Sequence, residues 1–476
     1  MWDKYPSGIW YPQCLEAQEV RGNGVFMVND SAQKTNDLFE HAPVHKAYFK
    51  LALPVVLGMV VSLVYNMVDT YFVAQTKNTA LIAGVSLCAP VFILLIALGD
   101  IFGLGGSSAV SRLFGEKREE AGRNVSGFCF YGALFGGLLV SAVLLVFQHP
   151  ILRLLGVTQE TYRYAEQYYR YMAVGAPAVM VSLDLGNMIR TEGMAMESMI
   201  GTVSGSVANI ILDPVFIFGL GMGAGGAAIA TVLGNLLTDV ILIYFVWRKS
   251  KKLTVSIKKA KVGRKEVFDI LLIGIPASVT NLMQSFSITL TNRYLIVYGA
   301  DKVAAMGIAM KVNMIVALVM VGFAFGAQPL IGYNYGAKNW ERLKRIIRFD
   351  LMVEMVFSIV ILSVLAVFAP QIVGMFLADA DIIGAGGLMI RCLIISAPFA
   401  GVVLVFVTVF QAMGKAGPAM VLSLGRQGVF FAVCIVVLAH AAGYYGIICA
   451  QAVADVVTMA AAVGLYLGVA RGTIPG

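Results

Sequence analysis

Twelve apolar segments between residues 49 and 470 constrain this chain more than any other feature of its sequence. A transmembrane helix needs about 20 consecutive apolar residues, and every segment reaches that length. Their approximate limits are 49–74, 80–112, 122–148, 160–189, 195–219, 223–247, 267–298, 302–333, 341–369, 382–412, 416–440 and 443–470. Hydrophobic residues make up 59% of the chain and charged residues 13%, whereas soluble proteins carry about a quarter charged residues. The sequence therefore predicts an all-α membrane protein with twelve transmembrane helices.

The basic residues are concentrated in every second loop. Twenty Lys and Arg residues lie in the loops that follow even-numbered segments, and three lie in the other loops. Because positive charge collects in cytoplasmic loops, we expect a multi-pass protein of the cell (inner) membrane with both termini in the cytoplasm. The net charge of +8 then reports orientation and does not indicate nucleic acid. Residues 1–46 are polar, lack the pattern of a signal peptide and predict a mobile cytoplasmic tail.

The two halves of the chain repeat each other at an offset of 220 to 223 residues. Pro54 falls on Pro276, and Gly115 falls on Gly336. Each half has six segments, so both insert the same way up, as in parallel repeats related by a pseudo-twofold axis along the membrane normal. Two six-helix lobes around a central cleft suit transport by alternating access. The predicted division is a tail (1–46), an N-terminal lobe (47–248), a basic cytoplasmic linker (249–266) and a C-terminal lobe (267–476).

Ionisable residues inside a membrane span are costly and indicate function by default. Asp69 shares a helical face with Tyr65, and Asn66 is within reach. Asp213 shares a face with Asn209 four residues earlier. Together with Thr231 of the next segment, these residues predict a reversible proton or cation site, because burial favours the protonated carboxyl group. The alternative is a hydrogen-bonded cluster that only fastens helices.

The second half differs at the equivalent positions. Asp69 corresponds to Thr291, and Asp213 corresponds to about Cys434. Gln284 belongs to a neutral polar stripe that faces the predicted cleft. We therefore expect the coupling site in the first lobe. The charged residues within second-lobe spans are expected to form ion pairs between helices: Lys311, Glu354, Arg426 and Asp455.

Four further residues carry open alternatives. Asp100 and Asp184 are weaker candidates for a transport role. Tyr168 either belongs to an interfacial aromatic belt or reaches the cleft. Pro54 lies 15 residues before Asp69 on the same span, and is either a hinge that responds to Asp69 or a static kink.

Four motifs resemble a known family. They are LPVVLGMVVSLVYNMVDTYFV (53–73), GGSSAVSRLFGEK (105–117), NIILDPVFIFGLGMGAGGAAIAT (209–231) and GAQPLIGYNYGAK (326–338). In combination they resemble the multidrug and toxic compound extrusion (MATE) family, in its prokaryotic drug-efflux branch. The resemblance covers residues 45–470.

This resemblance implies a twelve-helix antiporter that exports organic cations and dyes against an inward flow of H⁺ or Na⁺. The positions that match the coupling cluster of similar family members are Asp69, Asn209, Asp213 and Thr231. Tyr168 and Pro54 also match family positions, the latter a proline proposed to bend on protonation. Relatives that bind Na⁺ in the second lobe use acids within the seventh and tenth spans, which this sequence lacks. Na⁺ at Asp69 and Asp213 stays open.

One alternative function is a MATE-related lipid-linked oligosaccharide flippase, which would need cleft arginines to hold a pyrophosphate. No clustered His or Cys residues and no nucleotide-binding motif occur in the sequence, so neither an enzyme, a cofactor nor a metal centre is expected. The expected partners are small amphipathic cations and the lipid bilayer, without nucleic acid, and a monomer is sufficient for the cleft.

Overall fold

The computed structural model describes residues 37–375 and 380–473, and this part of the chain is helical without strands. The α-helices are α2 (Val44–Gln75), α3 (Thr79–Leu87), α4 (Ala89–Gly115), α5 (Glu119–Val146), α6 (Gln148–Leu154), α7 (Gln159–Val174), α8 (Ala176–Thr191), α9 (Ala195–Pro214), α10 (Gly223–Arg248), α11 (Arg264–Leu295), α12 (Ala300–Gly336), α13 (Trp340–Gly374), α14 (Ala380–Ile394), α15 (Ala397–Ala412), α16 (Ala416–Leu424) and α17 (Phe430–Thr473). Short π-helices follow α9 (η1, Val215–Gly219) and α16 (η4, Gly425–Val429), and short 3-10 helices are η2 (Ile257–Lys259) and η3 (Ile296–Tyr298).

The helices reproduce the twelve predicted spans. Within the described residues, ten helical runs are long and apolar enough to cross a membrane, and α7 and α8, which meet at 50°, make an eleventh span. The run Ala416–Val469 holds 54 residues, roughly 80 Å of helix and far more than a bilayer needs. Its backbone leaves the helical region at Gly443 (φ 57°, ψ −129°), where the chain turns back. The run therefore crosses twice, which confirms twelve spans.

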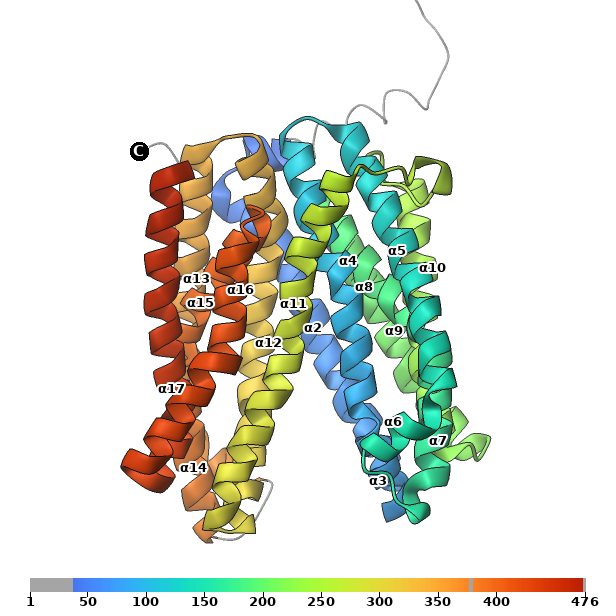
Figure 1. Cartoon of the computed structure of the whole chain (residues 1–476), viewed down its shortest axis with the longest axis vertical. Helices are drawn as coiled ribbons and strands as arrows, with labels where there is room; N and C mark the ends of the chain where they lie inside the picture. Colours follow the sequence, from blue (N-terminus) through green and yellow to red (C-terminus); the bar gives the residue numbers. More distant parts are fainter. Residues whose placement is uncertain (1–36, 376–379, 474–476) are drawn as a thin grey trace, which may run out of the picture.

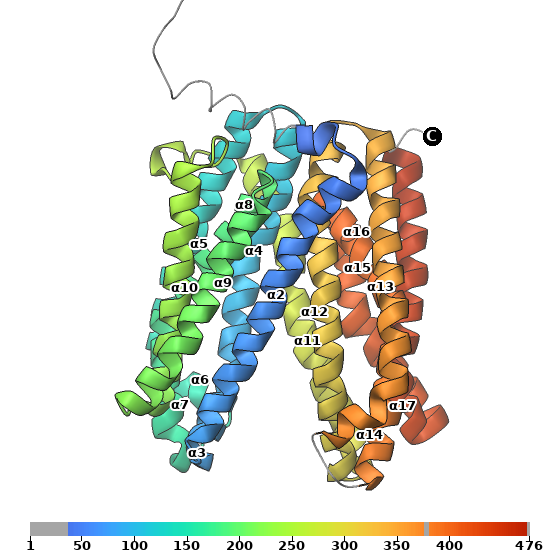
Figure 2. The same cartoon turned by 180° about the vertical axis from the view of Figure 1, so that it is seen from behind.

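The helices form two lobes joined by the loop between α10 and α11. In Figure 1, α2 to α10 make up one lobe and α11 to α17 the other, and Figure 2 shows the same division from behind. The helices converge at the end that carries this loop and diverge toward the opposite end. The basic α4–α5 and α12–α13 turns lie at the convergent end, as do both ends of the described chain.

Buried apolar side chains show where the lobes are joined. The largest cluster contains residues of both lobes at the convergent end, among them Leu51 of α2 and Ile331 of α12. Two other clusters each belong to one lobe: one contains Tyr169 and Met172 of the first lobe, and the other contains Met306 of the second. The lobes thus share a core at one end and keep separate cores toward the other.

Glycines let the two lobes approach each other symmetrically. A methyl group at Gly115 would lie 2.0 Å from the carbonyl oxygen of Tyr333, and one at Gly336 would lie 2.1 Å from that of Arg112. Gly115 and Arg112 are the repeat equivalents of Gly336 and Tyr333, so the same contact occurs twice. Only glycine permits such close backbone approach between helices.

Part of the predicted tail is anchored to the rest of the protein. Leu38 and Phe39 are buried, and Arg342 Nε donates a hydrogen bond to the carbonyl of Phe39 at 2.8 Å. Glu40 contacts both Lys117 of the first lobe and Tyr333 of the second. Helix α2 begins at Val44, three residues before the predicted start of the N-terminal lobe at residue 47. Residues 1–36 lie outside the described chain.

Candidate functional site

The first-lobe residues predicted to carry coupling lie on three adjacent helices. Asn209 and Asp213 are one turn apart on α9, and Asn209 Nδ2 donates to Thr231 Oγ1 of α10 at 3.3 Å. Asp213 is fully buried, and neither of its carboxylate oxygens has a hydrogen-bond partner. The π-helix Val215–Gly219 follows directly, as π-turns often do beside functional residues.

Asp69 of α2 faces the same region. Its charge and that of Asp213 act on each other, and both act on the hydroxyl groups of Tyr65 and Tyr168. Asp69 Oδ1 is buried without a hydrogen-bond partner. Neither carboxylate forms an ion pair with any described basic side chain. The structure thus brings Asp69, Asp213, Tyr65 and Tyr168 together, and Tyr168 is 8% exposed rather than on an outer belt.

Two further predicted residues lie on α2: Asn66 is beside Tyr65 of this cluster, and Pro54 lies apart from it. Asn66 is exposed and its Nδ2 donates to the carbonyl of Ser62 in its own helix at 2.7 Å. Pro54 is buried near the convergent end, where neighbouring Val56 lies against Gly322 of α12. Helix α2 continues unbroken through Pro54, roughly 22 Å from Asp69 along the helix. Whether Pro54 acts as a hinge or as a static kink stays a prediction.

Sequence reasoning undervalued one first-lobe acid and missed another. Asp184 of α8 is fully buried with neither oxygen bonded, and Asp239 of α10 is 6% exposed with Oδ1 unbonded. The charge of Asp184 acts on Asp239, so they form a second acidic pair. In the sequence, Asp239 directly follows Thr238, which lies on the same polar stripe of α10 as Thr231. Two unpartnered carboxyl pairs therefore lie within one six-helix lobe.

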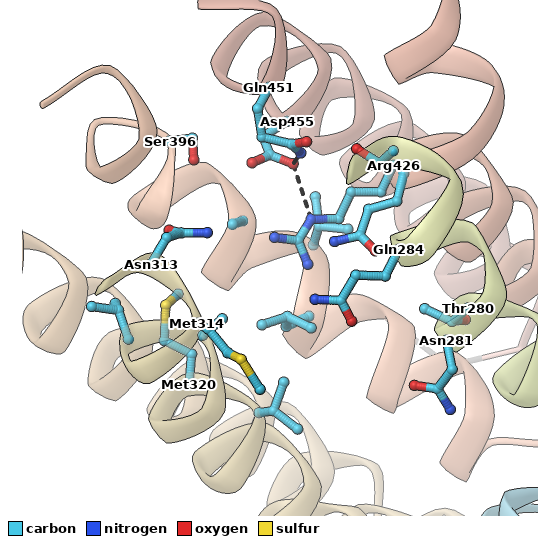
Figure 3. A pocket seen from close by; sticks show the side chains of 18 of the residues that line it. Thr280, Asn281, Gln284, Asn313, Met314, Met320, Ser396, Arg426, Gln451 and Asp455 are labelled. Atoms are coloured by element: carbon cyan, nitrogen blue, oxygen red, sulfur yellow. Dashed lines mark hydrogen bonds and ion pairs between the residues drawn. The ribbon is translucent and has the colours of Figure 1, made fainter. Parts of the chain in front are cut away.

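Gln284 lines a cavity of about 600 Å³ in the second lobe (Figure 3). Helices α11, α12, α15 and α17 build most of its wall, and Asp100 and Leu104 of α4 close it toward the first lobe. Gln284 is therefore separated from the other predicted site residues. The amide of Asn281 donates to Asp100 Oδ2 at 3.1 Å, so Asp100 takes part in the contact between lobes.

The charged residues of the second lobe pair only in part. Arg426 Nε donates to Asp455 Oδ1 at 2.9 Å, and Gln451 Nε2 donates to the same oxygen at 3.0 Å. This confirms the predicted ion pair for these two residues. The prediction is wrong for Lys311 and Glu354, which pair with no described residue, and both oxygens of buried Glu354 lack a hydrogen bond. The backbone N–H group of Ala324 lies near Glu354. It lies inside α12, where backbone N–H groups donate to the helix itself.

A third buried acid of the second lobe, Asp350 of α13, accepts a hydrogen bond from the first lobe. Tyr48 of α2 donates its hydroxyl to Asp350 Oδ1 at 2.8 Å. Both side chains are fully buried.

Among the described residues, no group of three or more His, Cys, Asp and Glu side chains is arranged to hold a metal ion.

Comparisons with known proteins agree with this architecture. The sequence model of the MatE family matches residues 54–215 and again residues 276–437. Both limits are displaced by 222 residues, which confirms the internal repeat. The chain is 31% identical to "Multidrug export protein MepA" of Staphylococcus aureus (strain MSSA476), over 90% of this chain and 95% of that protein.

Solved structures share the fold over nearly their whole length. One is titled "Outward-facing conformation of a multidrug resistance MATE family transporter of the MOP superfamily", with a TM-score of 0.87, 25% identity, and coverage of 93% of this chain and 99% of that one. Another is a transporter from Pyrococcus furiosus whose title reads "Reverse polarity of binding pocket suggests different function", with a TM-score of 0.85, 26% identity, and coverage of 92% and 98%. The chain therefore belongs to the MatE family of multidrug and toxic compound extrusion transporters.

Proposed function

We propose that this protein is a secondary active antiporter that exports amphipathic, mostly cationic compounds in exchange for H⁺ or Na⁺. The observation that carries the proposal is the first-lobe cluster around Asp69 and Asp213. These carboxylates lie inside the membrane region, and no described basic residue forms an ion pair with them. An unpaired buried carboxylate is costly, so it gains stability by taking up a proton, a sodium ion or a cationic substrate. Competition among these ligands couples ion entry to export.

The two lobes provide the alternating access that antiport needs. They share a core at the convergent end and have separate cores toward the other. The basic loops and both described chain ends lie at the convergent end, which the positive-inside rule assigns to the cytoplasm. The proposed state is therefore outward-facing, in the cell membrane, with both termini cytoplasmic. Rocking of the lobes would expose the acids to the cytoplasm.

The coupling ion needs no resident cofactor in this proposal. For Na⁺, the cluster supplies oxygen ligands from Asp69, Asp213, Asn209 and Thr231, the ligand type that hard cations prefer. For H⁺, either carboxylate suffices. The protein would act as a monomer in the bilayer, bind small amphipathic cations rather than nucleic acid, and carry out no covalent chemistry. The relative named as a multidrug export protein supports the export of varied small molecules.

A lipid-linked oligosaccharide flippase is the second candidate. A flippase needs basic residues in the cleft to hold a pyrophosphate. One observation favours it, because Arg426 and Lys311 line the second-lobe cavity. Arg391, by contrast, donates to the backbone of Ala366. Cells that lack a flippase would accumulate lipid-linked precursors and show unchanged dye retention.

Ethidium efflux from liposomes containing the purified protein tests the proposal. A pH gradient and a Na⁺ gradient are imposed separately. Efflux with the pH gradient alone identifies proton coupling, and efflux with the Na⁺ gradient alone identifies sodium coupling. Absence of efflux under both gradients contradicts antiport and favours the flippase.

A further inference from the structure

The second-lobe cavity contains a lysine with no carboxylate partner. Lys311 lies on α12, roughly 16 Å from the start of that helix, and its side chain is exposed on the cavity wall. No ion pair joins it to any residue that the structure describes. A lysine at this depth faces a high cost unless it reaches water or an anion. Its position on a cavity wall therefore indicates a role in binding.

The acids of the cavity do not neutralise Lys311. Asp455 is fully buried and already accepts bonds from Arg426 and Gln451. Asp100 accepts a bond from Asn281 and lies within reach of the charge of Arg190 in the first lobe. Each acid that lines the cavity thus has a protein donor or cation of its own, and Lys311 contributes an uncompensated positive charge.

Other hydrogen-bond donors point into the same space. The ion pair with Asp455 uses Nε of Arg426, and Figure 3 shows the rest of the guanidinium group directed into the cavity. The amide groups of Gln284 and Asn313 point toward the same space from α11 and α12. An anionic group that entered the cavity would find several donors in addition to Lys311.

The rest of the wall suits an apolar molecular body. Met310, Met314, Met320 and Phe325 line the cavity beside these donors, and methionine adapts to ligands of varied shape. The cavity volume of about 600 Å³ falls within the usual range of small-molecule sites. The cavity thus combines the charge of Lys311 and several hydrogen-bond donors with apolar walls.

We propose that the second-lobe cavity binds amphipathic organic anions or zwitterions, with Lys311 contacting their carboxylate, sulfonate or phosphate group. The proposal extends the export function proposed above, on which its transport meaning rests, to a second substrate class. The expected cationic substrates gain nothing from Lys311, because like charges repel. The acids of the first lobe and the lysine of the second would then serve ligands of opposite charge.

Binding of tritiated taurocholate to the purified protein tests this site. Taurocholate carries one sulfonate on a rigid apolar body and is measured in nanodiscs of phosphatidylcholine, a lipid without net charge. K311Q is expected to weaken binding about tenfold to hundredfold, the range for loss of a charged hydrogen bond. K311R should recover most of it. K302Q, which removes a lysine from the first turn of the same helix outside the cavity, should bind as the wild type does.

Ethidium efflux separates a binding role from a structural one. Removing a positive charge favours a cation, so K311Q should export ethidium at least as fast as the wild type. Equal taurocholate binding by K311Q and wild type would overturn the proposal. So would a parallel loss of taurocholate binding and ethidium efflux in K311Q, because it would assign Lys311 to the integrity of the lobe.

The anionic group can come from a soluble molecule or from a lipid headgroup, and a second nanodisc composition distinguishes these sources. If phosphatidylglycerol displaces taurocholate from the wild type, the site accepts a lipid phosphate. If it does not, the site takes soluble anions. Failure of the wild type to bind taurocholate, with ethidium efflux intact, rejects the anion site and keeps the antiporter. Lys311-dependent binding without ethidium efflux keeps the site and rejects cation export.

Discussion

The two lobes share one backbone plan but differ in the chemistry of their interiors. Gly115 and Gly336 make equivalent contacts with the opposite lobe, as the repeat requires. Inside the first lobe, the charge of Asp69 acts on Asp213, and neither has a basic partner among the described residues. Inside the second, Asp455 is held by Arg426. The contrast indicates that symmetry provides the scaffold for movement, whereas the ligand chemistry comes from positions where the repeats have diverged.

Glu354 limits this contrast. It is 1% exposed and neither oxygen is hydrogen-bonded, so one second-lobe acid resembles those of the first. It differs because the charge of Arg426 acts on it. No cation acts in this way on Asp69 or Asp213 among the described residues. The charge of one guanidinium therefore reaches two buried carboxylates of the second lobe, although it forms an ion pair with Asp455 and not with Glu354.

The largest expected effect comes from neutralising the first-lobe acids. D69N and D213N should each lower gradient-driven ethidium efflux at least about hundredfold, because an amide of the same size cannot load a proton and binds cations poorly. The measurement is initial efflux from liposomes under the gradient that drives the wild type. D301N, which removes an exposed carboxylate at the outer start of α12, is the matched control. Wild-type efflux by either first-lobe variant would remove that acid from coupling.

Much of the fold could be predicted from the sequence because spans, loop charge and the repeat are each local patterns. The predicted offset of 220 to 223 residues contains the observed displacement of 222 residues. The predicted limits of the apolar segments agree closely with the bounds of α2 to α13. Asp239 could not be predicted as a partner of Asp184, because helix rotation, rather than spacing along one helix, decides which buried side chains meet. The packing of residues 37–43 was missed for a similar reason. Two apolar residues, Leu38 and Phe39, are too short a run to show in the sequence that they pack against Arg342 and Tyr333.

The symmetric glycine contacts offer a second test, in which the rate of ethidium efflux should fall about tenfold. G115A and G336A each place a methyl group about 2 Å from a carbonyl oxygen of the other lobe, so the lobes must separate at the convergent end. Because the positions are equivalent, both variants should slow efflux and speed hydrogen exchange in residues 327–340 to the same degree. G417A is the control, since nothing lies within 4 Å of an added methyl group there. An effect from one variant alone would show that this interface is asymmetric.

Breaking the second-lobe ion pair should affect stability more than coupling. D455N leaves the partly buried Arg426 without its carboxylate and should lower the free energy of unfolding by about 3 kcal/mol. Thermal unfolding in detergent measures this loss. The double variant R426Q/D455N should recover part of it, because the partly buried charge of Arg426 is then removed together with its partner. A change in the gradient that drives D455N would place the coupling ion in the second lobe and reverse the comparison.

The smallest effect is expected where residues 37–43 bridge the lobes outside the membrane. Burial opposes ionisation of Glu40, but hydrogen bonds from Lys117 and Tyr333 and the charge of Lys117 hold the pKa of Glu40 below its ordinary value of 4.5. The same bridge, against the effect of burial, holds the pKa of Lys117 above its ordinary value of 10.5. Stability from a lowered carboxyl pKa is complete above pH 4.5 and is lost as the pH falls through the lowered value. Stability from the raised lysine pKa is complete below pH 10.5 and is lost as the pH rises through the raised value.

E40Q should therefore lower stability near pH 7 by about 0.2–1 kcal/mol, the range for exposed ion pairs, and remove part of the acid-side loss. Melting temperatures of wild type and E40Q from pH 3 to 8 measure both effects. E120Q is the matched control, because Glu120 is an exposed carboxylate at the same end that forms no ion pair with any described residue. Curves that stay parallel through the acid range would mean that the bridge does not hold the lobes together. Convergence of the curves at low pH would make Glu40 a charge-dependent contact at the end where the two lobes are otherwise equivalent.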